Sequence, residues 1–188
     1  MPLLSICLRR YALPVLLSLL SAAALRGQAS SPTASRAADL QVGAGVTIAR
    51  HDYVYAPPTD GVDISGATIY ATYDFRQHLG VEFNFRELTS HNADHLGESS
   101  YEIGPRYVWH FRRFNPYVRV SYGRGVFNYP YDVANLAYNM FAAGGGVDVN
   151  VLKHMNVRAD FDYQYWLSFP DPPHIKPKVG TIGVAYHF

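Results

Sequence analysis

Eight charged residues are the strongest candidates for chemistry in this sequence. They carry both signs and alternate with mostly apolar positions along the chain: Glu82, Arg86, Glu102, Arg106, Arg119, Arg158, Asp160 and Asp162. Alternate residues of an extended chain point to the same face, so the pattern predicts that these side chains gather inside a fold and pair there. Buried charges must be paired, because an unpaired one costs several kcal/mol. Two roles stay open for such a set, a plug of salt bridges or a narrow ion path.

Two other motifs give weaker signals. His91 and His95 flank Asp94 at the i, i+4 spacing of a helical metal site, but the segment has the polar composition of an exposed loop. The segment Gly144–Gly146 is not a phosphate-binding loop, because strand residues follow it where a phosphate site needs a helix N-terminus. We interpret these glycines as room for bulky neighbours or as a bend in the wall. We therefore expect neither a metal nor a cofactor.

The elements that position these residues are strands. From Asp39 onward the apolar residues recur with a period of two, and the 15 Tyr and 10 Phe favour strands over helices. Eight strands are expected, each close to the length of about 10 residues that a tilted strand needs to span a bilayer. Longer loops at 51–63, 91–98, 129–136 and 169–177 alternate with tight turns at 76–78, 112–115 and 152–155. With an even strand count all loops meet at one rim, which is the sidedness of a transmembrane barrel.

The first 29 residues are predicted to lie outside the fold. Arg9 and Arg10 precede an apolar run at 11–25, and small residues follow near position 29, as in a cleaved signal peptide. The run is too short for a spanning helix. We expect residues 1–29 to be this signal, 30–38 a flexible lead-in and 39–188 a single barrel domain.

The charge of the chain excludes one class of partner. Removing Arg9, Arg10 and Arg26 from the 16 basic residues leaves 13 against 15 acidic ones, so we expect no nucleic-acid binding. Cys7 lies within the predicted signal and is the sole cysteine, so the mature chain has no disulfide. Charged residues make up only 16% of the chain, against about 25% in soluble domains.

The two faces of the strands favour a membrane barrel over a soluble one. A soluble barrel would bury the apolar face. Here the other face carries glycine, alanine and serine, which suit the cramped interior of an eight-stranded barrel. Aromatic residues also gather toward strand ends, as two membrane interfaces require. Those near the turns are Tyr73, Phe75, Trp109, Phe111, Tyr186 and Phe188, and those near the loops are Tyr101, Phe127, Tyr129, Tyr138 and Phe141.

On these features the sequence resembles the small eight-stranded outer-membrane barrels, the group of the OmpA transmembrane domain and OmpX. The resemblance covers about Leu40 to Phe188 and includes the final Tyr186-His187-Phe188. It implies that Tyr186 and Phe188 are the residues that the barrel-assembly machinery recognises. Some barrels of this size act on lipid A with a histidine and a serine two residues later. None of the eight histidines here has a serine at that spacing, so no base stands beside a hydroxyl and no enzyme is expected.

The sequence thus predicts an all-β, eight-stranded antiparallel up-and-down transmembrane β-barrel in the bacterial outer membrane. Its expected role is structural or surface interaction, with a lumen plugged by charged side chains. A small pore, a lipid A-modifying enzyme and a soluble barrel that binds an apolar ligand are the alternatives. Expected partners are outer-membrane lipid, the assembly machinery during insertion and an extracellular ligand of the four loops.

Overall fold

The computed structural model describes residues 38–51, 62–90, 96–129, 134–167 and 175–188. Within these ranges the regular elements are eight strands: β1 (Asp39–His51), β2 (Val62–Asp74), β3 (Leu79–Thr89), β4 (Gly97–Val108), β5 (Phe114–Asn128), β6 (Asn135–Leu152), β7 (Met155–Trp166) and β8 (Lys178–His187). No helix in the described ranges is long and apolar enough to cross a membrane.

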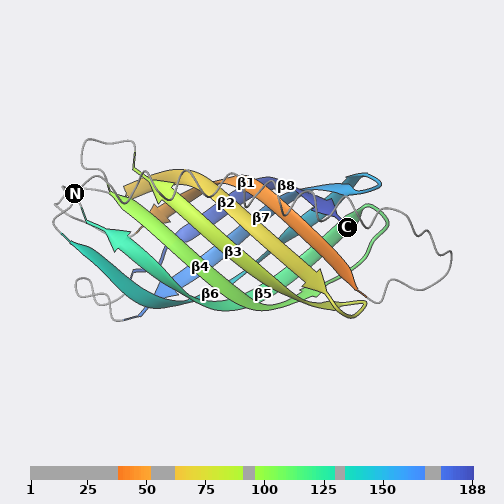
Figure 1. Cartoon of the computed structure of the whole chain (residues 1–188), viewed down its shortest axis with the longest axis horizontal. Coiled ribbons are helices and arrows are strands. Elements are labelled where there is room, and N and C mark those ends of the chain that lie inside the picture. The colour runs from red at the N-terminus through yellow and green to blue at the C-terminus, as the bar shows by residue number, and fades with distance from the viewer. Residues whose placement is uncertain (1–37, 52–61, 91–95, 130–133, 168–174) are drawn as a thin grey trace, which may run out of the picture. The chain divides into compact units, whose positions relative to one another are not determined.

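Each strand pairs antiparallel with the next, and β8 pairs with β1, so the sheet closes into a barrel (Figure 1). The closing ladder runs from Gln41 opposite His187 to Arg50 opposite Lys178. Closure removes the unpaired strand edges that hydrocarbon does not tolerate. The predicted all-β, eight-stranded antiparallel up-and-down fold is confirmed.

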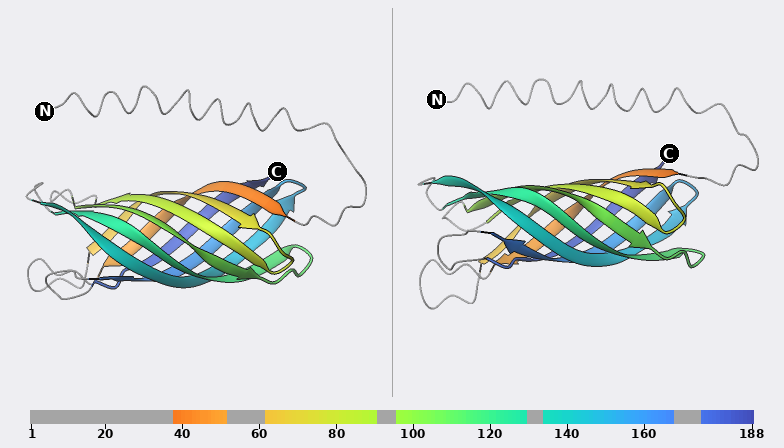
Figure 2. Two further views of the ribbon diagram at one scale, coloured as in Figure 1. Left: turned by 60° about the horizontal axis from the view of Figure 1, so that its bottom comes forward. Right: turned by 90° about the horizontal axis from the view of Figure 1, so that it is seen from below.

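The two ends of the barrel differ in how the strands are joined. At one end, the turn rim, short turns at Phe75–His78, Trp109–Arg113 and Lys153–His154 join consecutive strands, and β1 begins and β8 ends there. The opposite end, the loop rim, carries the four longer connections. Figure 2 shows the strands running obliquely between these ends, with the C-terminus at the turn rim.

The predicted element bounds lie within three residues of the observed ones. The predicted loops 91–98 and 129–136 included Gly97, Glu98, Asn135 and Leu136, which lie in β4 and β6. Polar character alone misled the prediction here, because Glu98 is a buried, inward-facing strand residue. The predicted fourth strand reached position 111, whereas β4 ends at Val108.

Successive side chains of each strand alternate between the outer surface of the barrel and its lumen. On β8, Ile182 and Val184 are 64% and 50% exposed on the outside, while Thr181 and Ala185 are buried inside. The same alternation holds along β1 and β2, where Val46, Ile48 and Ile69 are exposed. The apolar face therefore points outward and the small or polar face points into the lumen.

Glycines on the inner wall make room for large side chains. A Cβ at Gly144 or Gly146 would overlap the backbone and side chain of Asp162 or the side chain of Asp160. This agrees with the interpretation of the glycine run as room for neighbours. At Gly125 a Cβ would overlap the indole ring of Trp166, which is the largest fully buried side chain among the described residues.

Candidate functional site in the barrel lumen

The eight charged residues predicted from the sequence lie together inside the barrel. They project inward from β3, β4, β5 and β7, and their side chains are at most 3% exposed. Each of the four arginines contacts at least two carboxylates. We call this set, together with Asp74 and Asp148, the ion-pair network.

Glu82 is the centre of one half of the network. Its Oε2 accepts hydrogen bonds from Nη1 of Arg106 at 3.0 Å and from Nη1 of Arg158 at 2.8 Å. Its Oε1 accepts a hydrogen bond from Arg119. Thr72 and Asn84 donate further bonds to the same carboxylate, each at 3.1 Å. One carboxylate on β3 thereby joins arginines from β4, β5 and β7.

Asp162 is the centre of the other half. Its Oδ2 accepts from Nη2 of Arg86 at 2.5 Å, and its Oδ1 accepts from Nε of Arg119 at 3.1 Å. Arg86 also pairs with Glu102, which accepts a bond from Ser121 at 2.9 Å. Arg119 therefore links the Glu82 half to the Asp162 half, and the two halves form one network.

The structure adds two acidic residues that the sequence-based set left out. Asp148 on β6 accepts hydrogen bonds from Arg158 at 2.7 and 3.0 Å and from Arg106 at 3.0 Å. Asp74, at the end of β2, lies 3.6 Å from Nε of Arg106. Strand alternation could have found both, since Asp74 shares the face of Thr72 and Asp148 shares the face of Gly146.

Two buried tyrosines complete the network on the side of the turn rim. The guanidinium of Arg158 lies 4.1 Å from the ring centroid of Tyr70 and 4.8 Å from that of Tyr117. The guanidinium of Arg106 lies 4.3 Å from the ring of Tyr117. Cations attract aromatic faces, more strongly when desolvated, so these rings stabilise the two guanidinium groups in addition to their carboxylate partners.

Toward the loop rim the lumen is filled by apolar side chains. This loop-side apolar cluster consists of Ala49, Ile64, Leu88, Leu96, Phe127, Met140, Ala142, Trp166, Ile175 and Val179. Tyr129 and Tyr138 pack against it, and their hydroxyl oxygens lie 3.1 Å apart. Within this cluster Trp166, Phe127 and Met140 are fully buried.

This cluster corrects one sequence-based assignment. Phe127, Tyr129 and Tyr138 were expected in the outer aromatic girdle, but Phe127 faces inward and the two tyrosines are partly buried against the cluster. Odd-numbered residues of β5 point inward, as Tyr117 and Arg119 do, and Phe127 follows the same alternation. Tyr101 and Phe141 are exposed on the outside, as expected of girdle residues.

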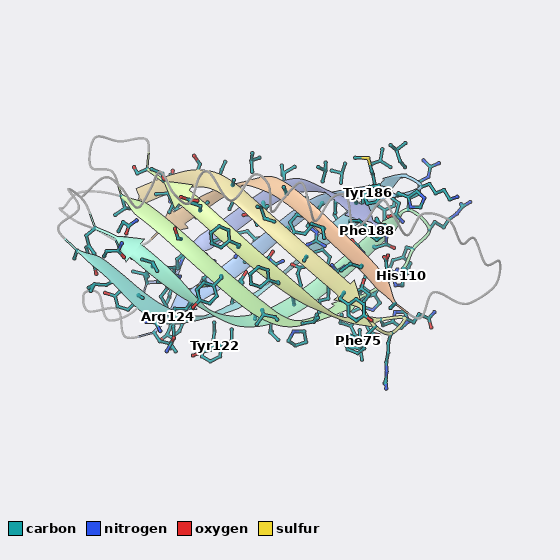
Figure 3. All side chains as sticks on the ribbon, viewed as in Figure 1. Phe75, His110, Tyr122, Arg124, Tyr186 and Phe188 are labelled. Carbon is teal, nitrogen blue, oxygen red and sulfur yellow. The ribbon has the colours of Figure 1, made fainter. Side chains whose placement is uncertain are left out.

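The last strand ends at the turn rim in a polar seam. Nδ1 of His187 lies 2.9 Å from Oδ2 of Asp39, which joins β8 to β1. Nδ2 of Asn156 donates to Oε1 of Gln41 at 3.0 Å. Tyr186 and Phe188 point outward at this end, with ring centroids 5.1 Å apart (Figure 3).

The weaker chemical motifs gain no support. His91, Asp94 and His95 lie outside the described residues. Within the described ranges, no group of three or more His, Cys, Asp or Glu side chains could hold a metal ion.

Comparison with known proteins identifies one matching family. The sequence profile of the family described as "Outer membrane protein beta-barrel domain" matches residues 13–188. The chain belongs to this family. No curated protein sequence matches it.

Solved structures of other outer-membrane barrels share the family fold. Neisserial surface protein A superposes with a TM-score of 0.67 at 13% identity, over 79% of this chain and 97% of that one. Ail of Yersinia pestis gives 0.55 at 16% identity, over 80% and 98%. The N-terminal barrel of Pseudomonas aeruginosa OprF gives 0.55 at 17% identity, over 80% and 97%.

Membership of the family places the barrel in the bacterial outer membrane. Barrels of this kind have short periplasmic turns and longer extracellular loops. On this pattern we expect the turn rim on the periplasmic side and the loop rim at the cell exterior. The signal peptide predicted for residues 1–29 lies outside the described residues and stays a prediction.

Proposed function

We propose that this protein is a closed, non-conducting outer-membrane barrel with a structural or surface-interaction role. The observation that supports this most directly is the filling of the lumen at two levels. The ion-pair network occupies the barrel interior, and the loop-side apolar cluster lies between it and the loop rim. A small pore is the second candidate function, since rings of charged side chains also line ion paths.

Single-channel recording in planar bilayers tests the closed state. Wild-type protein is expected to give no steady, discrete conductance, and such conductance would contradict the proposal. A Trp166→Ala, Phe127→Ala variant removes the apolar barrier only, and an Arg86→Ser, Asp162→Ser variant removes part of the network only. Neither of these two variants should give channel conductance, whereas the variant that combines all four substitutions should conduct ions.

We also propose a non-enzymatic role. No histidine of the sequence has a serine two residues later, so no base stands beside a hydroxyl at the spacing of the lipid A enzymes. The lipid A of cells that overproduce the protein is therefore expected to keep its mass. A new lipid A species that depends on the protein would assign it to the enzymes instead.

We further propose that contact with the exterior runs through the loops 51–63, 91–98, 129–136 and 169–177. Segments 51–63 and 129–136 carry tyrosine and proline, with Tyr53, Tyr55 and Tyr131 among them, and segment 169–177 carries proline. When each loop in turn is replaced by a short Gly-Ser segment, at least one replacement should abolish binding to an extracellular ligand without altering the heat-dependent mobility of the barrel. Binding that survives all four replacements would contradict this assignment.

Insertion is proposed to depend on Tyr186 and Phe188, through the barrel-assembly machinery. Both side chains are about half exposed at the periplasmic rim, where a periplasmic receptor could reach them. Deleting Phe188 should lower the amount of inserted protein in cells by more than it lowers the unfolding temperature of refolded protein. Comparable losses in both measurements would point to a structural role only.

A further inference from the structure

The turn rim carries an arc of basic side chains that neither the lumen nor the proposed function uses. Arg76 lies in the β2–β3 turn, Arg112 and Arg113 in the β4–β5 turn, and Lys153 in the β6–β7 turn. All four are exposed, and none forms an ion pair with a carboxylate of the described residues. We call this set the basic turn arc.

Among the described residues, no acidic side chain pairs with this arc. The three turns contain no Asp or Glu. The two acidic residues at the same rim, Asp39 and Asp74, are engaged with His187 and Arg106. At the loop rim the signs are mixed: Arg50 lies 3.9 Å from Asp63, and the segments 52–61, 91–95, 130–133 and 168–174 contain five Asp and no Lys or Arg.

Each cation of the arc sits beside an exposed apolar side chain. Phe75 precedes Arg76, Phe111 and Phe114 flank the two central arginines, and Leu152 precedes Lys153. Phe111, Phe114 and Leu152 are 61%, 58% and 63% exposed on the outside of the barrel. Figure 3 shows Phe75, Tyr186 and Phe188 at this same end. An aromatic belt marks the level of the lipid headgroups, so the four cations lie at phosphate depth.

Hydrogen bonds hold the turns in place relative to one another. Nε2 of His110 donates to the carbonyl oxygen of Gln77 at 2.7 Å, which ties the β4–β5 turn to the β2–β3 turn. The backbone N–H of Asn150 donates to the carbonyl oxygen of Arg113 at 2.8 Å, which ties β6 to the same turn. The spacing of the charges is therefore set by the fold, and an anionic surface would meet a preformed array.

Arg112 also stands where another residue type would fit the backbone better. Phe111 and Phe114 exchange two backbone hydrogen bonds, so Arg112 and Arg113 are the two central residues of a tight hairpin. Arg112 has a φ of 51°, the left-handed region that glycine and asparagine favour at this position. The strain that arginine introduces is evidence that its side chain serves a purpose other than forming the turn.

We propose that the basic turn arc binds the phosphate headgroups of anionic phospholipid in the periplasmic leaflet. The belt of exposed aromatic residues places the arc in the membrane interface and not in free periplasm, which selects a lipid as its partner over an acidic protein. Arginine and lysine near an anionic membrane surface each strengthen association about fivefold.

Lipid selectivity in reconstituted membranes tests the proposal. Full-length protein is placed in phosphatidylcholine vesicles with a trace of spin-labelled phosphatidylglycerol or spin-labelled phosphatidylcholine, and the fraction of label immobilised at the protein is measured. Wild type should prefer phosphatidylglycerol, and salt should weaken this preference. Changing Arg76, Arg112, Arg113 and Lys153 together to glutamine should lower the preference at least fivefold.

Two further variants keep the result interpretable. The matched control changes the outward cations near the loop rim, Arg50, Arg124, Lys176 and Lys178, to glutamine and should keep the wild-type preference. Arg112→Gly removes one charge and the backbone strain, so it should fold at least as stably as wild type and still lose preference. The proposal fails if wild type shows no preference, if the turn-rim variant retains it, or if the loop-rim control loses it.

Discussion

The ion-pair network and the loop-side apolar cluster fill the same lumen, but they differ in how they tolerate change. An apolar cluster loses stability gradually, by the area and volume of what is removed. A buried charge network loses more, because deleting one partner leaves the others desolvated and unpaired. The comparison indicates that the network is the more sensitive of the two and the cluster the more adaptable. Four sets of substitutions test this difference.

The largest loss is expected for Glu82→Ala in the ion-pair network. It removes the one carboxylate that Arg106, Arg119 and Arg158 have in common and leaves each of these buried guanidinium groups with one partner fewer, so about 5 kcal/mol of unfolding free energy should be lost. Urea unfolding in detergent micelles, followed by tryptophan fluorescence, measures it. Glu87→Ala, on the exposed side of the same strand, is the matched control and should change stability by under about 0.5 kcal/mol. Equal losses would show that the network faces water.

The next loss is expected for Trp166→Ala in the loop-side apolar cluster. Removing a fully buried tryptophan should cost about 4 kcal/mol, measured in the same urea titration but followed by circular dichroism. Since the cluster and the network share no residue, the double variant with Glu82→Ala should lose the sum of the two single losses. A coupling above about 1 kcal/mol would mean that the two levels act as one unit.

A smaller loss is expected where a wall glycine gains a methyl group. Gly125→Ala places a Cβ against Trp166 in the cluster, and Gly43→Ala places one against Tyr70 beside the network. Overpacking should cost about 2 kcal/mol at each site. Gly180→Ala has nothing within 4 Å of the added atom and serves as the control. The unfolding temperature in detergent ranks the three, and a large effect at Gly180 would overturn the packing explanation.

The smallest loss is expected at a hydroxyl cluster on β1, β2 and β8. The hydroxyl of Thr47 lies 2.5 Å from that of Thr68 and 3.0 Å from that of Thr181. Thr47→Val removes these bonds with little change of volume and should cost about 1 kcal/mol. Chemical denaturation midpoints compare it with Thr89→Val, on the exposed end of β3. A gain in stability would mean that the hydroxyls are a liability inside the barrel.

Much of the fold could be predicted from the period-two pattern, because the sheet faces lipid on one side and a polar lumen on the other. The alternation of Val81, Phe83 and Phe85 with Glu82 and Arg86 assigns the two faces of β3 without further information. The three short turns follow from the polar and basic residues that interrupt this pattern. The ends of the strands are harder to predict, because polar residues such as Glu98 still pair with the neighbouring strand near the loops.

The partners within the lumen could not be predicted in the same way. Glu82 meets Arg158 across the barrel, from β3 to β7. Such a contact depends on the stagger of the strands around the closed sheet, which no local pattern of residues sets. Proximity to a loop predicts an outward Phe127, whereas the alternation that runs through Arg119 places Phe127 inside. The loop-side apolar cluster follows from the same alternation together with the closure of the barrel.

The position of Glu82 has a consequence for how the chain reaches its final state. Its carboxylate joins arginines from β4, β5 and β7, which lie 24, 37 and 76 residues further along the chain. Contacts between distant segments form late in folding, because loop closure must come first. A barrel that is still open holds arginines with only part of their partners, and such a half-paired state is higher in free energy than either the unfolded or the closed one. Closure should therefore be an all-or-none step, with few long-lived intermediates between the open sheet and the finished barrel.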